Sequence, residues 1–437
     1  MIKRFYSDLF IYALPMFLAR AVGLLLLPIY TRQLGPVDFG FIEFVAASST
    51  ILLLVLPLEI NQAVGRLIPE ADSNLNQYKI FTSAFWFTFA VFFGFGSLIY
   101  ISRFQLLDAL NLSQNYAQYA LLICIHFLVL ALVNLLQVKF RFTSQAKSSV
   151  TINLSVVMSN FILVLYFSSL DKLGIEQYFL SQILAGLIGI TLGVVMLSKQ
   201  YKTPPLLKYI DILVLKKLLK YSMPLVVSSL GIALATSIDR VIIGSSVGLK
   251  ELGYYGAALR LSAIVALGFY VISSAMTPTV YRDHVKAETK LFIAGIFQTT
   301  SFITITLLAV ITFYSAEIID LFAGEQFSTA SKYLFYLTLS AVISGLYIFF
   351  LGMDIQKNTT LLSKINLSVG ATVTILTCLS VPLYGVWGAV FSNLAGGIFR
   401  LSGYVYFSQK LYFVPFKFAW LISLICFLII INAAITI

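Results

Sequence analysis

Long apolar runs alternate with short polar loops along the whole chain. A run of about 20 apolar residues can cross a bilayer as a helix, because each residue adds ~1.5 Å and the hydrocarbon core is ~30 Å thick. The pattern predicts thirteen such helices. They are expected at Leu9–Tyr30, Phe39–Gly65, Phe81–Ser102, Ala117–Val138, Val150–Ser168, Tyr178–Leu197, Tyr221–Gly244, Leu252–Tyr281, Leu291–Tyr314, Tyr333–Gly352, Leu362–Tyr384, Val386–Phe407 and Phe416–Ile435.

Composition agrees with this pattern. The 437 residues are 59% hydrophobic and 11% charged, whereas a soluble domain carries about 25% charged residues. We therefore expect an all-α integral membrane protein, which excludes a soluble enzyme. The first apolar segment lacks a small-residue cleavage site and is expected to act as an uncleaved insertion signal. Cys124, Cys378 and Cys426 have no metal-binding spacing and are expected to be small buried hydrophobic residues.

Basic residues are distributed unevenly between the two sets of loops. Twenty of the 29 Lys and Arg residues fall on one side. The other side carries only Arg32, Arg103, Lys172, Lys250 and Lys332. The positive-inside rule then predicts a multi-pass protein whose N-terminus is cytoplasmic. The net charge of +11 is thus interpreted as a topology signal, and no nucleic-acid partner is expected.

The longest polar interruption, Ser198 to Lys220, divides the chain near its middle. It is basic, contains Pro204 and Pro205, and ends in an amphipathic stretch suited to a membrane surface. We therefore expect a six-helix N-terminal lobe over 1–200, a cytoplasmic linker over 201–220 and a six-helix C-terminal lobe over 221–410. An additional C-terminal transmembrane helix is expected over 411–437.

An internal repeat supports this division. The stretch "IYTRQLGPVDFGFI", from Ile29, aligns with "IIGSSVGLKELGYY", from Ile242, and keeps a Gly, an acid and a second Gly. "INLSV" also occurs twice, from Ile152 and from Ile365, at the same offset. With six spans each, both halves cross the membrane in the same sense. The lobes are therefore expected to be related by a parallel pseudo-two-fold around a central cavity, as in transporters.

Three stretches carry a family resemblance: "PIYTRQLGPVDFG", "RLIPE" and "IDRVIIGSSVGLKELGYYGAALRLS". They resemble the Wzx-type polysaccharide and O-antigen repeat-unit flippases of the multidrug/oligosaccharidyl-lipid/polysaccharide flippase superfamily. The resemblance implies translocation of undecaprenyl-pyrophosphate-linked oligosaccharides from the cytoplasmic to the periplasmic leaflet of the bacterial inner membrane. It implies alternating access through a cationic cavity, contact with membrane lipids, and glycosyltransferases and a polymerase as partners. A thirteenth span departs from the twelve or fourteen of relatives and leaves the C-terminal topology open.

Three arginines lie deep in apolar segments by helix rise: Arg20, Arg260 and Arg400. An arginine stays charged at any relevant pH and binds phosphate through two donors at once. We expect these three to bind the pyrophosphate headgroup. The alternative is that each pairs with an acid or with helix-end carbonyls and only locks the lobes together.

The fourth intramembrane arginine, Arg240, follows Asp239 directly in "SIDRVIIG". Neighbouring helix residues point about 100° apart, so the two are expected to face different partners. Counting helix rise from Lys220 places them near the outer mouth, as an outer gate. An arginine that extends to the interface is the alternative for Arg240.

Coupling to a proton or sodium gradient needs a group that can change charge, and Glu43, Glu59 and His126 are the candidates. The alternative is a static ion pair for each glutamate and a helix-packing hydrogen bond for the histidine. No Walker, HExxH or GxSxG motif is present. We therefore expect no enzymatic activity and no cofactor.

Two other functions are alternatives to the flippase. An ion-coupled small-molecule (drug) antiporter of the same fold would need buried carboxylates to hold a cation. The deep charges here are mainly arginines, which favours an anionic headgroup. A membrane glycosyltransferase or polymerase would need a large loop with catalytic residues, and the longest loop is the linker.

Overall fold

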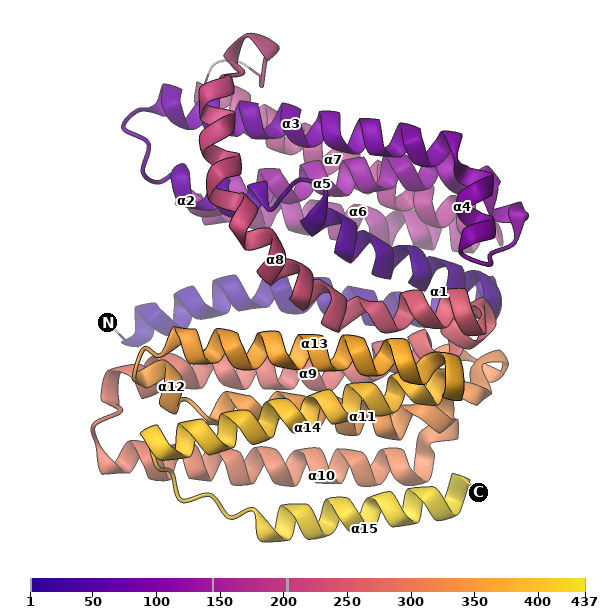
Figure 1. Ribbon diagram of the computed structural model, residues 1–437, viewed down its shortest axis with the longest axis vertical. Helices are drawn as coiled ribbons and strands as arrows, with labels where there is room; N and C mark the ends of the chain where they lie inside the picture. The colour runs from indigo at the N-terminus through magenta and orange to yellow at the C-terminus, as the bar shows by residue number, and fades with distance from the viewer. Residues whose placement is uncertain (1, 144, 202–203, 437) are drawn as a thin grey trace. The chain divides into compact units, whose positions relative to one another are not determined.

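The computed structural model describes residues 2–143, 145–201 and 204–436, which form helices, turns and loops with no strand among them (Figure 1). Nine helices in this part of the chain are long and apolar enough to cross a membrane, which confirms an all-helical multi-span fold. The α-helices are α1 (Ile2–Val55), α2 (Ile60–Leu67), α3 (Asn74–Ile101), α4 (Arg103–Ala109), α5 (Ala120–Phe142), α6 (Ala146–Ser169), α7 (Ile175–Tyr201), α8 (Ile212–Ile242), α9 (Leu249–Asp283), α10 (Ala287–Ala323), α11 (Ser331–Gly345), α12 (Gly352–Ile355), α13 (Thr359–Tyr384), α14 (Val386–Leu411) and α15 (Ala419–Thr436).

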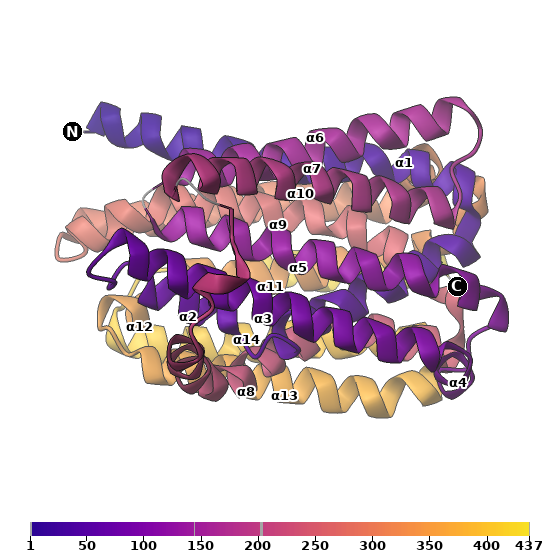
Figure 2. The same cartoon turned by 90° about the horizontal axis from the view of Figure 1, so that it is seen from above.

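The chain forms two compact units. The first unit comprises Met1–Leu34 and Phe44–Ser237, and the second comprises Gly35–Glu43 and Ile238–Ile437. The boundaries between the two units therefore lie within α1 and α8 and not in the linker. Within each unit the long helices lie roughly side by side (Figures 1 and 2).

Helix α1 is two helices joined at Gly35, whose φ of 69° lies in the left-handed region that favours glycine. The predicted span Phe39–Gly65 is wrong beyond Val55. There the helix stops, Leu58 and Glu59 adopt φ of 50° and 55°, and α2 begins at Ile60. Pro57 accounts for the break, because proline has no N–H to donate to the preceding turn.

The linker is shorter than predicted. Helix α7 continues to Tyr201 and α8 already begins at Ile212, so the basic amphipathic stretch forms the first turns of α8. The irregular part packs against the start of α3. Tyr78 donates a hydrogen bond to the carbonyl of Pro204 and Trp86 donates one to Pro205 at 3.1 Å. These bonds anchor the linker on the first unit.

The core of the first unit is apolar and joins α2, α3, α5, α6, α7 and α8. Fully buried members include Ala63, Phe81, Leu135, Ile152 and Leu218. Of the three cysteines, Cys124 is buried as expected, but Cys378 and Cys426 are exposed on α13 and α15. Apolar side chains on such faces can be accommodated by lipid, so burial in protein was the wrong expectation for these two.

The repeated glycines of the sequence meet in the second unit. Gly248, the counterpart of Gly35, also has positive φ (129°) and precedes α9. A Cβ on Gly40 would collide with the backbone of Leu249 and Gly253, and a Cβ on Gly253 would collide with Pro36. The two copies of the motif therefore pack backbone against backbone. This close approach carries Glu43, one turn further along, toward α9.

Candidate functional site

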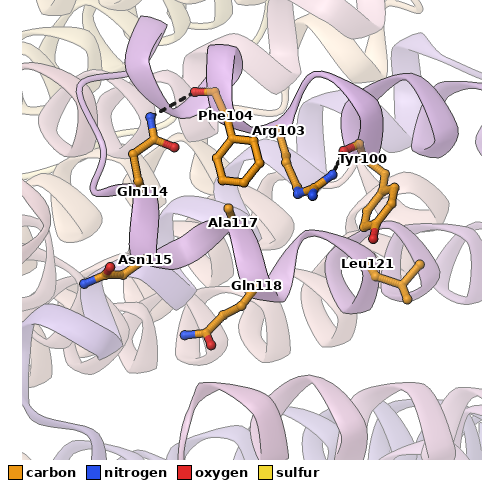
Figure 3. Close-up of a pocket in the computed structure, with 8 residues that line it drawn as sticks. All are labelled: Tyr100, Arg103, Phe104, Gln114, Asn115, Ala117, Gln118 and Leu121. Carbon is orange, nitrogen blue, oxygen red and sulfur yellow. Dashed lines mark hydrogen bonds between the residues drawn. The ribbon is translucent and has the colours of Figure 1, made fainter.

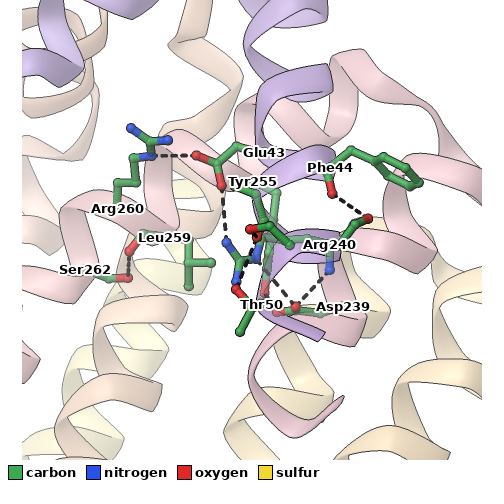
Figure 4. A network of polar contacts seen from close by, with 12 residues as sticks. Glu43, Phe44, Thr50, Asp239, Arg240, Tyr255, Leu259, Arg260 and Ser262 are labelled. Atoms are coloured by element: carbon green, nitrogen blue, oxygen red, sulfur yellow. Dashed lines mark hydrogen bonds and ion pairs between the residues drawn. The ribbon is translucent and has the colours of Figure 1, made fainter. Parts of the chain in front are cut away.

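Glu43 lies at the centre of a network of charges in the second unit (Figure 4). It is 2% exposed, and its two carboxylate oxygens face different arginines. Arg260 Nε donates to Glu43 Oε1 at 2.5 Å, and Arg240 Nη1 lies 3.4 Å from Glu43 Oε2. One buried carboxylate thus faces two guanidinium groups.

Asp239 completes the network through other partners. Its Oδ2 accepts hydrogen bonds from the Tyr255 hydroxyl at 2.5 Å and from Asn393 Nδ2 at 3.0 Å. Its Oδ1 accepts one from the backbone N–H of Arg240 at 2.8 Å. The side chains of Asp239 and Arg240 make only a long contact, at 4.0 Å. Two acids and two arginines balance in charge, as buried ions require.

Small residues make the network possible. A Cβ on Gly256 would lie 2.6 Å from Cγ of Glu43, so only glycine leaves room for that side chain on α9. The guanidinium carbon of Arg260 lies 5.0 Å from the centre of the Phe39 ring, within cation–π range. Packing of α1 on α9 therefore sets the position of both partners of this ion pair.

Arg240, expected near the outer mouth, and Arg260, expected at depth, are brought together in the structure. Both contact the same carboxylate. Arg240 precedes the turn at Gly248 by eight residues and Arg260 follows it by twelve, which gives ~12 Å and ~18 Å by helix rise.

The third predicted headgroup ligand, Arg400 on α14, has a different environment. Its Nε is buried and has no hydrogen-bond partner among the described residues. Its guanidinium carbon lies 5.9 Å from the centre of the Tyr347 ring. Tyr347 packs edge-on against Tyr404, whose hydroxyl accepts a hydrogen bond from Asn366 at 3.3 Å. The side chain of Arg20 falls outside the described residues.

The remaining candidates lie in the first unit. Glu59 is 3% exposed, at the break between α1 and α2, and its Oε1 has no hydrogen-bond partner in the described part of the chain. The ring of His126 packs at 5.6 Å from that of Phe179 on α7. Glu43, in contrast, has the geometry of an ion pair. Glu43 belongs to the second unit, whereas Glu59 and His126 belong to the first.

The sequence missed the residues that complete these environments. In the sequence, Tyr255 and Tyr404 are ordinary aromatic residues in apolar runs, and Asn393 is one polar residue within a span. The Tyr255 hydroxyl and the Asn393 amide approach Asp239 on α8, and the Tyr404 hydroxyl approaches Asn366 on α13. A single sequence does not contain that information. The described residues hold no group of three or more His, Cys, Asp or Glu suited to a metal ion.

Comparison with solved structures identifies the fold. The lipid II flippase MurJ, in an inward closed conformation, matches with a TM-score of 0.73 and 16% identity over 98% of each chain. An inward-facing multidrug resistance MATE family transporter of the MOP superfamily matches with a TM-score of 0.67 and 15% identity, over 90% of this chain and 95% of that chain. A mutant of the Vibrio cholerae MATE transporter VcmN matches with a TM-score of 0.61 and 16% identity, over 92% of this chain and 96% of that chain. The fold is therefore that of transporters and flippases.

Sequence comparison adds one relative and a family. An uncharacterized membrane protein of Methanocaldococcus jannaschii is 28% identical over 257 residues, which are 52% of this chain and 60% of that protein. The match thus spans less than two thirds of the relative's length. The family model "Polysaccharide biosynthesis protein" matches residues 5–284, more than half of the chain. This multi-pass membrane protein belongs to the polysaccharide biosynthesis protein family.

Proposed function

We propose that this protein is a flippase that moves polyprenyl-pyrophosphate-linked oligosaccharides, with undecaprenol as the carrier, from the cytoplasmic to the periplasmic leaflet of a bacterial inner membrane. The observation that carries the proposal is the combination of a polysaccharide biosynthesis family with a flippase and transporter fold. A membrane-spanning bundle in such a family must act on a sugar that is itself in the membrane. Lipid-linked intermediates meet that condition.

The chemistry of Arg400 supports an anionic headgroup. An arginine within a membrane helix is costly and is usually paired or functional. Arg400 has no ion-pair partner among the described residues, so its donors are available to a pyrophosphate. Arg260 is 27% exposed despite its bond to Glu43, and it remains a second headgroup ligand in this proposal, with Arg20 as the third.

Orientation follows from the basic residues of the first unit. The start of α3, the end of α7 and the linker meet around Tyr78, which packs against Tyr201 and Tyr209. Lys79, Lys199 and Lys208 all belong to these segments. By the positive-inside rule we assign this end, and with it the N-terminus, to the cytoplasm.

Reconstitution of the protein in liposomes tests the proposal. A fluorescent polyprenyl-pyrophosphate-linked oligosaccharide would be quenched by external dithionite only after it reaches the outer leaflet. We expect the wild type to flip it and Arg400→Gln to flip it roughly ten- to hundredfold more slowly, as expected for loss of a charged hydrogen bond. The control Lys332→Gln changes an exposed lysine of α11 and should be normal. No flipping by the folded wild type would refute the proposal.

One observation favours a second candidate, an ion-coupled small-molecule antiporter. Glu59 is a buried carboxylate with an unpartnered oxygen, which is the kind of group that binds a proton or cation. If this candidate is correct, a proton or sodium gradient should drive uptake of a cationic dye into the liposomes, and Glu59→Gln should abolish it. The flippase predicts no dye uptake. Coupling of flipping itself to either gradient would appear as loss of flipping when the gradient is collapsed.

A further inference from the structure

A pocket of about 590 Å³ lies at one end of the first unit (Figure 3). Its walls come from the end of α3, from α4, from the 3₁₀ helix η1 (Gln114–Tyr119) and from the start of α5. Its volume falls within the range of about 300–1,000 Å³ that is usual for small-molecule sites.

Aromatic rings and one arginine form one wall. The guanidinium carbon of Arg103 lies 4.5 Å from the centre of the Tyr100 ring and 4.6 Å from that of Phe104. One N–H, on Nη1, donates to the carbonyl of Tyr100 at 2.7 Å. Arginine has five such donors, so this side chain is held in place with most of its donors still available. Tyr100 and Phe104 remain 41% and 50% exposed.

Carboxamides form the other wall. Gln114 donates to the carbonyl of Phe104 at 3.1 Å and to Asp108, which joins η1 to α4. The side chains of Asn115 and Gln118 make no hydrogen bond to other described residues, and both are exposed. A carboxamide both donates and accepts, as does a sugar hydroxyl. Three carboxamides beside two aromatic rings are therefore suited to a pyranose, which has apolar C–H faces and a rim of hydroxyls.

The pocket and the linker lie at opposite ends of α3. Tyr78 holds the linker and Tyr100 lines the pocket. The two are 22 positions apart, which is ~33 Å of helix, about the thickness of a bilayer core. If the linker end is cytoplasmic, the pocket faces the periplasm. It would then meet the oligosaccharide after translocation.

We propose that this pocket is a binding site for an acidic saccharide on the exit side of the protein. Tyr100 and Phe104 pack against a sugar ring, Asn115 and Gln118 bind its hydroxyls, and the donors of Arg103 bind a carboxylate in two-point geometry. The inference rests on the proposed function for its biological substrate, because the sugar of the translocated lipid is the saccharide that reaches this face.

Saturation-transfer NMR on the protein in nanodiscs tests the site directly. The probes are a hyaluronan tetrasaccharide, which is acidic, and chitotetraose, which is neutral. We expect transfer to the acidic probe, weakened several-fold or more in Phe104→Ala, Gln118→Ala and Arg103→Gln. Phe93→Ala and Arg66→Gln are matched controls, because each changes an exposed residue of the first unit outside the pocket, and both should bind normally.

Three outcomes would overturn the proposal. Absence of transfer to both probes refutes the site. Equal transfer to the acidic probe in the wild type and in all variants refutes these residues as ligands. Equal transfer to both probes, unchanged in Arg103→Gln, refutes the acidic assignment. The result is separable from that of the flipping assay. Flipping without probe binding refutes the pocket alone, and probe binding without flipping refutes the proposed function alone.

Discussion

The two units treat buried charge differently. In the second unit Glu43 and Asp239 are surrounded by donors from α8, α9 and α14. In the first unit Lys139 is fully buried without an acidic partner among the described residues. Its Nζ contacts Gln200 Oε1 at 2.6 Å and lies 4.4 Å from the centre of the Phe140 ring. Glu59, in the same unit, keeps an unpartnered oxygen.

This contrast separates charges that hold the structure together from charges that the structure merely tolerates. Removal of one partner from a buried ion pair leaves an uncompensated charge and is strongly destabilising. Removal of a charge that has no partner relieves a cost of desolvation. Removal of a buried charge should therefore lower stability in the second unit and leave it unchanged or raise it in the first.

Glu43→Gln should have the largest effect. The variant removes the carboxylate that both Arg240 and Arg260 contact, and we expect the protein to lose about 3–5 kcal/mol of stability. Thermal unfolding in detergent, followed by circular dichroism, measures the loss. Glu70→Gln, in an exposed pair with Arg66, is the control and should change little. Equal behaviour of the two variants would contradict a structural role for the network.

Tyr255→Phe should have the second-largest effect on stability. It removes a hydrogen bond to an ionised carboxylate but keeps the ring, so we expect a loss of about 1.5–3 kcal/mol. Thermal unfolding in detergent measures this loss of stability, and Tyr254→Phe, at the adjacent position, is the matched control. A double variant of Tyr255 and Asn393 should lose less than the sum of the single losses, because both bind Asp239 Oδ2. Strict additivity would show that they act independently.

Glu59→Gln should have the smallest effect on stability, and that effect should be of opposite sign. Its carboxylate has an unpartnered buried oxygen, so the neutral amide should leave stability unchanged or raise it by about 1 kcal/mol. A loss as large as that of Glu43→Gln would mean that Glu59 is structurally paired and would remove the contrast between the units. Unchanged stability with loss of gradient-dependent transport would assign it to ion coupling.

The sequence predicts the helices well because apolar length alone determines which segments can span a bilayer. Its errors lie where that criterion carries no information, at the break caused by Pro57 and at the start of α8. The charged residues of the site were also found, because charge in an apolar run is rare. Their partners were not, since Glu43 is 197 residues from Arg240 and 217 from Arg260.

Gly35–Glu43 belongs to the second unit although it lies near the start of the chain. A gene divided in the linker would therefore yield a C-terminal fragment that lacks the carboxylate between Arg240 and Arg260. Such a fragment should be unstable alone and should recover only when the N-terminal fragment is co-expressed. The same dependence of the second unit on residues 35–43 applies to chimeras between relatives. A C-terminal half should be exchanged together with its own copy of residues 35–43, because those nine residues and the helix they contact form a single packing unit.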